Sequence, residues 1–265
     1  MRRSRWIALA TLAAACQSPT APPTGPRVQL HAHNDYLHPR PLQQALAAGF
    51  TSVEADVFLV DGELRVGHER WQLRPGRTLT SLYLEPLHRG WQADGQFAPG
   101  VTQVQLLVDI KADAAAVHRA LAAELSRYRD MLTRFRDDGV TCGAVTVILS
   151  GSRPRELVAA EPERLCAIDG RLADLTASPP PSPFLVPLVS DSWSRVCDWD
   201  GRDEPLPAER VRLRDLVAQA HAQGRQLRFW GIPDRIECWR ELAEAGVDWI
   251  GSDRLRDCAA WYRDR

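Results

Sequence analysis

The stretch SVEADVFLVDGELRVGH at residues 52–68 begins with apolar and acidic side chains in alternation. The apolar positions are Val53, Ala55 and Val57, and the acids between them are Glu54 and Asp56. Successive side chains of a β-strand point to opposite faces, so the apolar residues share one face and the two acids share the other. We therefore expect a strand whose apolar face packs against helices and whose acidic face points the opposite way.

Similar short apolar runs recur along the chain and alternate with amphipathic stretches. The expected strands are 28–33, 52–58, 105–110, 144–149, 164–168, 184–189, 226–230 and 249–251, with a hairpin strand at 63–66 after Asp61-Gly62. The expected helices are 41–48, 114–135, 154–160, 208–223 and 235–245. This regular alternation predicts an α/β fold, a single-domain (β/α)8 TIM barrel. A doubly wound sheet is the alternative, but it would need a reversal point that the even spacing does not suggest.

The N-terminal residues differ from the rest of the chain. Residues 1–16, MRRSRWIALATLAAAC, combine arginines with an apolar run too short to cross a membrane, which is typical of an export signal. The alanines before Cys16 resemble a bacterial lipoprotein cleavage box, which implies lipidation of Cys16 and a membrane anchor; cleavage that releases a soluble protein is the alternative. Residues 17–27 are a predicted disordered Pro-rich tether, and 28–265 are the predicted barrel. Both alternatives predict an exported bacterial envelope protein, either a periplasm-facing lipoprotein or a secreted protein.

The net charge and the cysteine spacing argue against nucleic-acid binding and against a zinc site. The formal net charge of −1 provides no positive field for nucleic acid, so nucleic-acid binding is not expected. The cysteines after Cys16 are Cys142, Cys166, Cys197, Cys238 and Cys258. Their spacing does not suggest zinc, and an odd number leaves at least one unpaired, so we expect mostly buried thiols. The oligomeric state is not indicated.

Polar residues gather where the predicted strands end, which is where the chemistry of such barrels takes place. They are His31, His33, Asn34, Glu54, Asp56, His68, Asp109, Lys111, Ser150, Asp191, Trp230 and Asp253. Three carboxylates directed into a barrel, those of Glu54, Asp56 and Asp109, would repel one another and lose hydration. One hard divalent cation would offset this cost, and all-oxygen ligands suit Mg²⁺ or Ca²⁺ better than zinc.

Several of these residues lie in motifs shared with a known superfamily. The motifs are HAHNDY at 31–36, SVEADVFLVDGELRVGH at 52–68, LLVDIK at 106–111 and, more weakly, GVDWIGSD at 246–253. In this order they resemble the phospholipase C-like phosphodiesterases, which include phosphatidylinositol phospholipases C, glycerophosphodiester phosphodiesterases and sphingomyelinases D. The HxHNDY form is most similar to the branch that contains the altered-inheritance-of-mitochondria proteins.

The resemblance implies a metal-dependent phosphoric diester hydrolase acting on a phospholipid or glycerophosphodiester substrate. It makes His33 and His68 the acid/base pair and makes Glu54, Asp56 and Asp109 metal ligands. Asn34 matches a ligand asparagine of the phospholipases C. The HRG and ENT motifs of the diesterases are absent, and Asp109 replaces their glutamate as in the sphingomyelinases D.

Lys111 is the only lysine, because the other basic residues among the 33 are all arginine. Lysine is a compact point charge and arginine is a wide planar fork, so the two are not interchangeable in a tight site. We interpret Lys111 as a catalytic residue that holds the non-bridging oxygens of a phosphate. Trp230, Ser150 and Arg228 are the predicted substrate-binding residues, and His31 is expected to lie deeper, in the core or behind the ligands.

Two alternative functions use the same residues. The pair His31 and His33 also fits amidohydrolase barrels, which bind metals through HxH, but those barrels need further histidines after the fifth and sixth strands. Here the corresponding segments, CAIDGR at 166–171 and LVSDSW at 188–193, contain none. The second alternative is a non-catalytic envelope lipoprotein that binds phospholipid headgroups on the same barrel.

Overall fold

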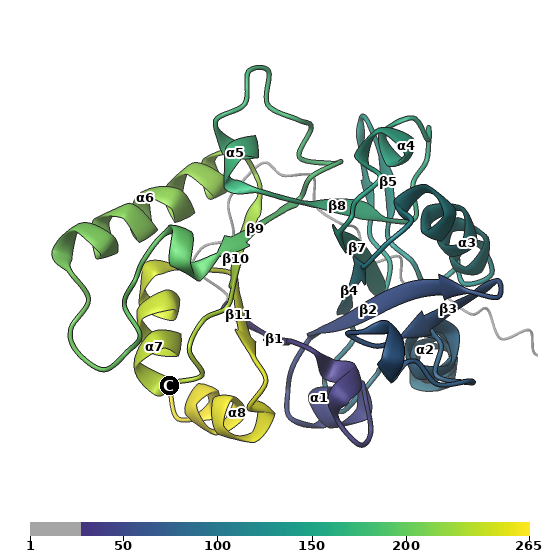
Figure 1. Cartoon of the computed structure of the whole chain (residues 1–265), viewed down its shortest axis with the longest axis horizontal. Helices are drawn as coiled ribbons and strands as arrows, with labels where there is room; N and C mark the ends of the chain where they lie inside the picture. The colour runs from purple at the N-terminus through teal and green to yellow at the C-terminus, as the bar shows by residue number, and fades with distance from the viewer. Residues whose placement is uncertain (1–27) are drawn as a thin grey trace, which may run out of the picture.

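The computed structural model describes residues 28–265. Eight parallel strands form a closed ring with the helices outside it (Figure 1). In ring order the strands are β1 (Gln29–Ala32), β2 (Ser52–Val60), β4 (Val104–Ile110), β7 (Val145–Gly151), β8 (Ala167–Gly170), β9 (Leu188–Ser192), β10 (Gln226–Trp230) and β11 (Trp249–Ser252). The ring closes where β1 pairs with β11 on one side and with β2 on the other. The predicted single-domain TIM barrel is confirmed.

The α-helices cover the outside of the ring. They are α1 (Gln43–Ala47), α2 (Glu85–Asp94), α3 (Ala114–Ser126), α4 (Arg155–Ala159), α5 (Leu172–Leu175), α6 (Pro207–Ala222), α7 (Ile236–Ala245) and α8 (Leu255–Arg263). Short helical turns are η1 (Asp35–Leu37), η2 (Arg70–Gln72), η3 (Thr80–Leu84) and η4 (Trp193–Arg195). Within residues 28–265, no helix combines the length and the hydropathy that crossing a membrane requires.

Two hairpins are added to the barrel. Strand β3 (Glu63–Val66) pairs antiparallel with β2 after the predicted turn, in which Asp61 and Gly62 both have positive φ. Strands β5 (Arg134–Arg136) and β6 (Gly139–Thr141) form a second hairpin. The sequence predicted helix as far as residue 135 here, and this is wrong because α3 ends at Ser126.

Alternation along the strands separates two apolar cores. Val53, Ala55 and Val57 belong to the large core between the strands and the helices, as predicted. A smaller cluster fills the inside of the ring and consists of Leu107, Phe135, Ile148, Ala167, Leu188 and Trp249. Cys166, Cys197, Cys238 and Cys258 are buried free thiols, as expected.

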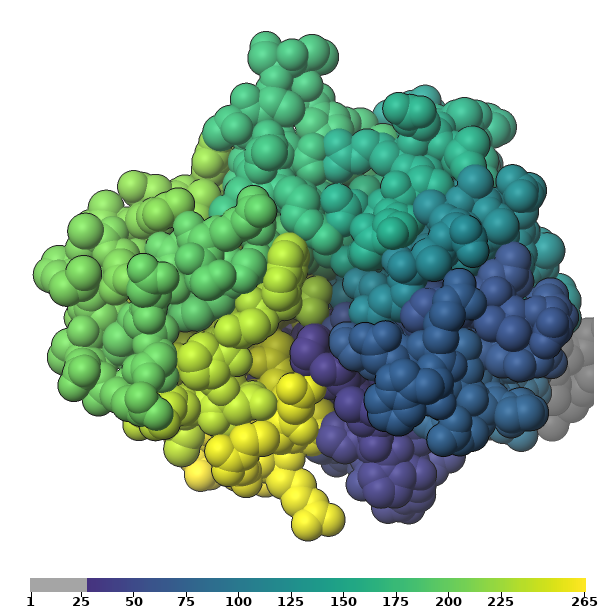
Figure 2. Space-filling model, in the orientation of Figure 1, coloured from purple at the N-terminus to yellow at the C-terminus, as the bar shows by residue number. Residues whose placement is uncertain are grey.

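Chain closure brings the two ends of the barrel together. The space-filling view shows purple residues near the start of the barrel beside yellow residues from its end (Figure 2). This contact follows from the β1–β11 register, in which Ala32 is paired with Ser252. Residues that follow β1 and β11, such as His33 and Asp253, are therefore neighbours although they are far apart in sequence.

Candidate active site

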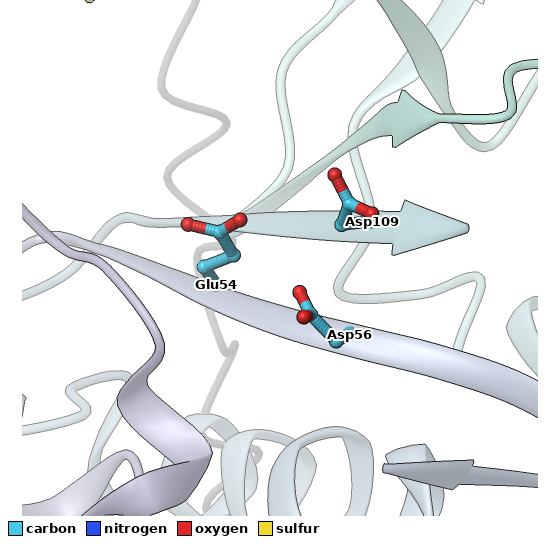
Figure 3. Close-up of side chains that lie close together, drawn as sticks. All are labelled: Glu54, Asp56 and Asp109. Carbon is cyan, nitrogen blue, oxygen red and sulfur yellow. The ribbon is translucent and has the colours of Figure 1, made fainter. Parts of the chain in front are cut away.

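Three carboxylates meet where the middle of β2 lies beside the C-terminal end of β4. Glu54 and Asp56 lie on β2, and the parallel register sets Asp56 directly beside Asp109 of β4. Figure 3 shows the carboxylates of all three side chains facing the same space. One oxygen from each lies within 4.8 Å of one oxygen from each of the others. The predicted trio is therefore brought together by the alternation of β2 and by the alignment of adjacent strands.

Asp56 lies at the centre of this group. Its side chain is fully buried, and its Oδ1 atom has no hydrogen-bond partner among the described residues. Burial, followed by the negative charge of Glu54, raises the pKa of Asp56. Burying a carboxylate oxygen without a hydrogen-bond donor costs free energy, and a bound cation would offset that cost. The donor set therefore fits an oxygen-coordinated divalent cation.

Lys111 points into the same group from the end of β4. Its Nζ lies 2.7 Å from Asp56 Oδ2 and 3.1 Å from Asp109 Oδ1. Burial by itself would lower the pKa of Lys111, but the charges of Asp109 and Asp56 outweigh it and raise the pKa. The single lysine of the chain therefore stays charged between two of the three carboxylates.

His33 follows β1 and lies between two acids. Its Nδ1 lies 2.9 Å from Asp253 Oδ1, and its Nε2 lies 3.9 Å from Glu54 Oε2. Burial would lower the pKa of His33, but the hydrogen bond with Asp253 and the charge of Glu54 raise it. Donation of the Nδ1 proton to Asp253 leaves Nε2 to exchange a proton within the site.

His68, in the loop after β3, is the second histidine of the site. Its Nδ1 lies 3.0 Å from Asp56 Oδ2. About half of its side chain is exposed, so the ring is accessible to a bound molecule. His33 and His68 thus share one arrangement, in which a carboxylate orients the Nδ1 side of the imidazole.

His31 and Arg228 hold Glu54 from behind. His31 is fully buried, as expected, with Nδ1 2.7 Å from Ser52 Oγ and Nε2 3.2 Å from Glu54 Oε2. Burial is the main cause that lowers the pKa of His31 to about 4, so the ring is neutral. Arg228 is buried and donates from Nη2 to Glu54 Oε2 at 3.3 Å. Burial alone would raise the pKa of Glu54, but the hydrogen bond with His31 and the charge of Arg228 hold it well below its usual range.

Tyr36 is a site residue to which the sequence reasoning gave no role. Its buried hydroxyl donates to Asp56 Oδ2 and lies 2.7 Å both from that atom and from Asn34 Oδ1. Asn34 adopts the left-handed conformation, with φ of 49°, and this turns its amide toward the site. The signal was present, because Tyr36 is the last residue of the quoted HAHNDY motif, two positions after Asn34.

The remaining predicted contacts are Ser150, beside Asp109 on the adjacent strand β7, and Trp230 at the end of β10. The Ser150 hydroxyl is buried and donates to Asp169 Oδ2 at 2.8 Å, so its proton is already engaged. Trp230 lies under the guanidinium of Arg171, whose Cζ is 4.6 Å from the indole ring. A cavity of about 70 Å³ lies between Trp230 and His33. Asp169, fully buried at the end of β8, is a further residue here that the sequence analysis did not assign; it lies in the CAIDGR segment at 166–171.

Comparison with known proteins identifies the family. Residues 25–166, more than half of the chain, match the model of the AIM6-like phosphodiesterase domain. The chain belongs to this family. An altered inheritance of mitochondria protein 6 homolog from Arthroderma benhamiae is 30% identical to it, over 89% of this chain and 84% of the relative. Altered inheritance of mitochondria protein 6 from Eremothecium gossypii is also 30% identical, over 86% and 67% of the two chains. The Saccharomyces cerevisiae relatives are longer, and the chain spans 61% of their length.

Two solved structures that share this fold are glycerophosphodiester phosphodiesterases. The enzyme from Parabacteroides distasonis superposes with a TM-score of 0.56 at 14% identity and covers 91% of this chain and 99% of its own. The enzyme from Agrobacterium tumefaciens gives a TM-score of 0.53 at 15% identity, covering 89% and 99%. At this identity the likeness shows the shared barrel fold alone.

The relatives correct the predicted localisation. Fungal proteins named for the inheritance of mitochondria match along most of this AIM6-like chain, and they point to a eukaryotic protein. The prediction of an exported bacterial envelope protein is therefore wrong. It depended on the predicted export signal, the lipidation at Cys16 and the tether over 17–27, all of which lie outside the described residues.

Proposed function

We propose that this AIM6-like protein is a metal-dependent phosphoric diester hydrolase that acts on a phospholipid or glycerophosphodiester substrate. One observation carries the proposal: three carboxylates lie within 4.8 Å of one another, with two carboxylate-oriented histidines beside them. The amidohydrolase alternative is not favoured, because His31 is fully buried behind Glu54 instead of facing a ligand.

The cation would be Mg²⁺ or Ca²⁺, held by Glu54, Asp56 and Asp109 with the amide oxygen of Asn34 as a further ligand. When bound, it would supply positive charge for the non-bridging oxygens of the phosphate. The orphaned oxygen of Asp56 supports this assignment. Lys111 would bind the same phosphate oxygens and stabilise the charge that grows on them as the diester is attacked.

The two histidines would transfer the protons. One imidazole takes the proton of the attacking hydroxyl as the hydroxyl oxygen forms a bond to phosphorus. The other imidazole protonates the leaving oxygen as the bond between that oxygen and phosphorus breaks. The two histidines together gain one proton and lose one, so the step balances in protons and in charge. Asp253 and Asp56 orient the two rings, and Tyr36 holds the Asp56 carboxylate in place.

Hydrolysis of bis-p-nitrophenyl phosphate by the purified protein tests this function. We expect turnover with Mg²⁺ or Ca²⁺ that is lost on addition of EDTA and restored by excess metal. Asp109→Asn should lower kcat by about 10³-fold, since a ligand charge is removed from the site that stabilises the transition state. The matched control is Asp61→Asn at the exposed turn of the β2–β3 hairpin, where asparagine tolerates positive φ.

Two outcomes would overturn the proposal. Turnover that persists in EDTA would refute the metal dependence. Calorimetric binding of Mg²⁺ or Ca²⁺ without hydrolysis of any diester would instead identify a binding protein on a phosphodiesterase barrel.

A further inference from the structure

A second charged group lies at the same end of the barrel as the carboxylate trio. Arg153 follows β7, which pairs with the Asp109 strand β4, and Arg171 follows β8, the next strand beyond β7. Arg171 donates from Nη1 to Asp169 Oδ2 at 3.1 Å. Arg153 is only partly exposed and donates to the backbone oxygen of Gly151, and it forms no ion pair with any carboxylate of residues 28–265.

The nearby acids are already fully engaged. Asp169 is completely buried and accepts hydrogen bonds from Ser150 at 2.8 Å, Ser190 at 2.6 Å and Arg171. Asp174 accepts two bonds of 2.7 Å from Arg155. Neither carboxylate is paired with Arg153, so the positive charge of Arg153 is left over. Burial and the charge of Arg171 lower the pKa of Arg153, which is consistent with two cations close together.

Arg171 is held in a fixed position. Its guanidinium rests on the Trp230 indole at 4.6 Å and donates to the backbone oxygen of Gly170 at 2.7 Å. Trp230 in turn lines the cavity beside His33. A guanidinium fixed in this way retains free donors for a ligand and loses little side-chain entropy on binding.

The arginines lie close to the proposed reaction centre. At Gly151, two residues before Arg153, an added Cβ would lie 2.5 Å from Asp109 Oδ1, so the end of β7 touches the carboxylate trio. Adjacent strands are about 4.8 Å apart, so a group bound at Arg153 and Arg171 lies roughly one or two strand spacings from the trio. That separation corresponds to a small polyol between two phosphates.

We propose that Arg153 and Arg171 form a subsite for a phosphate monoester on the substrate, so that the preferred diester carries a second phosphate beyond the one that is cleaved. This inference rests on the proposed diesterase function. A dianionic group is favoured because guanidinium forks bind phosphate oxygens in pairs. A cationic headgroup such as choline would be repelled by the uncompensated charge of Arg153.

The test uses two soluble p-nitrophenyl phosphodiesters of glycerol that differ only in a phosphate monoester on the far carbon. We expect wild-type protein with metal to prefer the phosphorylated compound by about 10- to 100-fold in kcat/KM, as expected of hydrogen bonds to a charged group. Arg153→Gln should reduce that preference to within about twofold of unity and leave turnover of the unphosphorylated compound unchanged. Arg195→Gln is the matched control, since this arginine follows β9 but is paired with Asp191, and it should keep the preference.

A parallel comparison identifies the source of the ligand. The same phosphorylated headgroup is supplied on a diacylglycerol in phosphatidylcholine vesicles. An Arg153-dependent preference in the soluble compound alone assigns the subsite to a free metabolite, and the same preference in vesicles assigns it to a lipid headgroup.

Failure of the subsite and failure of the diesterase give different results. Equal cleavage of the two soluble compounds by wild-type protein would overturn the subsite and leave the diesterase standing. If neither compound is cleaved, the binding of glycerol 1-phosphate to wild-type protein and to Arg153→Gln, measured by calorimetry in EDTA, tests the subsite separately. Binding that Arg153→Gln weakens by about tenfold or more supports the subsite without the diesterase, and binding that Arg153→Gln leaves unchanged overturns it.

Discussion

At the residue scale, Lys111 shows why one lysine occurs in a chain that otherwise uses arginine. Its ammonium fits between Asp56 and Asp109 at 2.7 and 3.1 Å, in a space also bounded by Glu54. A guanidinium is planar and wider, and it would spread its charge over more space than these carboxylates leave. The lysine is therefore explained by the geometry of the site.

Lys111→Arg is predicted to lower kcat by about 10²-fold while the protein still folds, because the charge is retained but misplaced. Steady-state hydrolysis of bis-p-nitrophenyl phosphate measures the rate, and thermal unfolding followed by circular dichroism reports on the fold. Arg119→Lys, on the exposed face of α3, is the control for exchanging basic residues and should change neither. Wild-type turnover in Lys111→Arg would remove Lys111 from the catalytic group.

Gly151 supports Asp109 by having no side chain. Its φ is +66°, and a Cβ there would lie 2.5 Å from both Asp109 Oδ1 and the backbone oxygen of Ile110. Both features favour glycine, one through backbone conformation and one through space. Gly151 thus allows β7 to approach the carboxylate trio.

Gly151→Ala is predicted to reduce both stability and metal-dependent turnover, because the methyl group must displace Asp109. Gly224→Ala separates the two causes: its φ is +68° and no atom lies within 4 Å of the added Cβ, so only the backbone cost of about 1 kcal/mol applies. Urea unfolding and the metal concentration for half-maximal activity measure the two effects. Equal losses in the two variants would mean that Asp109 is not displaced.

At the scale of elements, the β5–β6 hairpin closes the end of the barrel opposite the site. Leu132 forms a bridge with Val145 at the start of β7, and Phe135 pairs with Arg164 just before β8. The Phe135 side chain then packs into the ring against Leu107 and Ile148. The hairpin therefore has a structural role and contributes no side chain to the carboxylate trio.

Phe135→Ala is predicted to cost about 3–5 kcal/mol of unfolding free energy, the usual range for removing a buried aromatic ring. Below the lowered melting temperature, kcat should be unchanged, since the cavity opens at the N-terminal end of the strands. Leu157→Ala, at an exposed position of α4, should stay within about 0.5 kcal/mol. A loss of kcat in folded Phe135→Ala protein would contradict this separation of stability and function.

At the scale of the whole molecule, much of the architecture could be predicted because barrel strands carry a local pattern. The expected runs at 52–58, 105–110 and 226–230 coincide with β2, β4 and β10. Strands β8 and β9 begin later than expected. The backbone of Arg164 pairs with Phe135 of the β5–β6 hairpin, and Ile168 N–H donates to the Leu185 oxygen before the β8–β9 pairing starts at Asp169 and Leu188. The hairpin itself could not be predicted, because the charged residues around Phe135 are typical of a solvent-exposed helix. Only the folded barrel shows that Phe135 fills the open end of the ring.

The sequence by itself determined the fold class, the face on which Glu54 and Asp56 lie, and the residue types available at the strand ends. Alternation and strand order carry that information, and both are local properties of the chain. Only the tertiary structure decided the partners: Asp253 for His33, Arg228 for Glu54 and Asp169 for Ser150. It also left Arg153, beside Arg171, without an ion pair among residues 28–265. Those relations join residues as much as 220 positions apart, and they exist because the ring closes in a single register that no local pattern records.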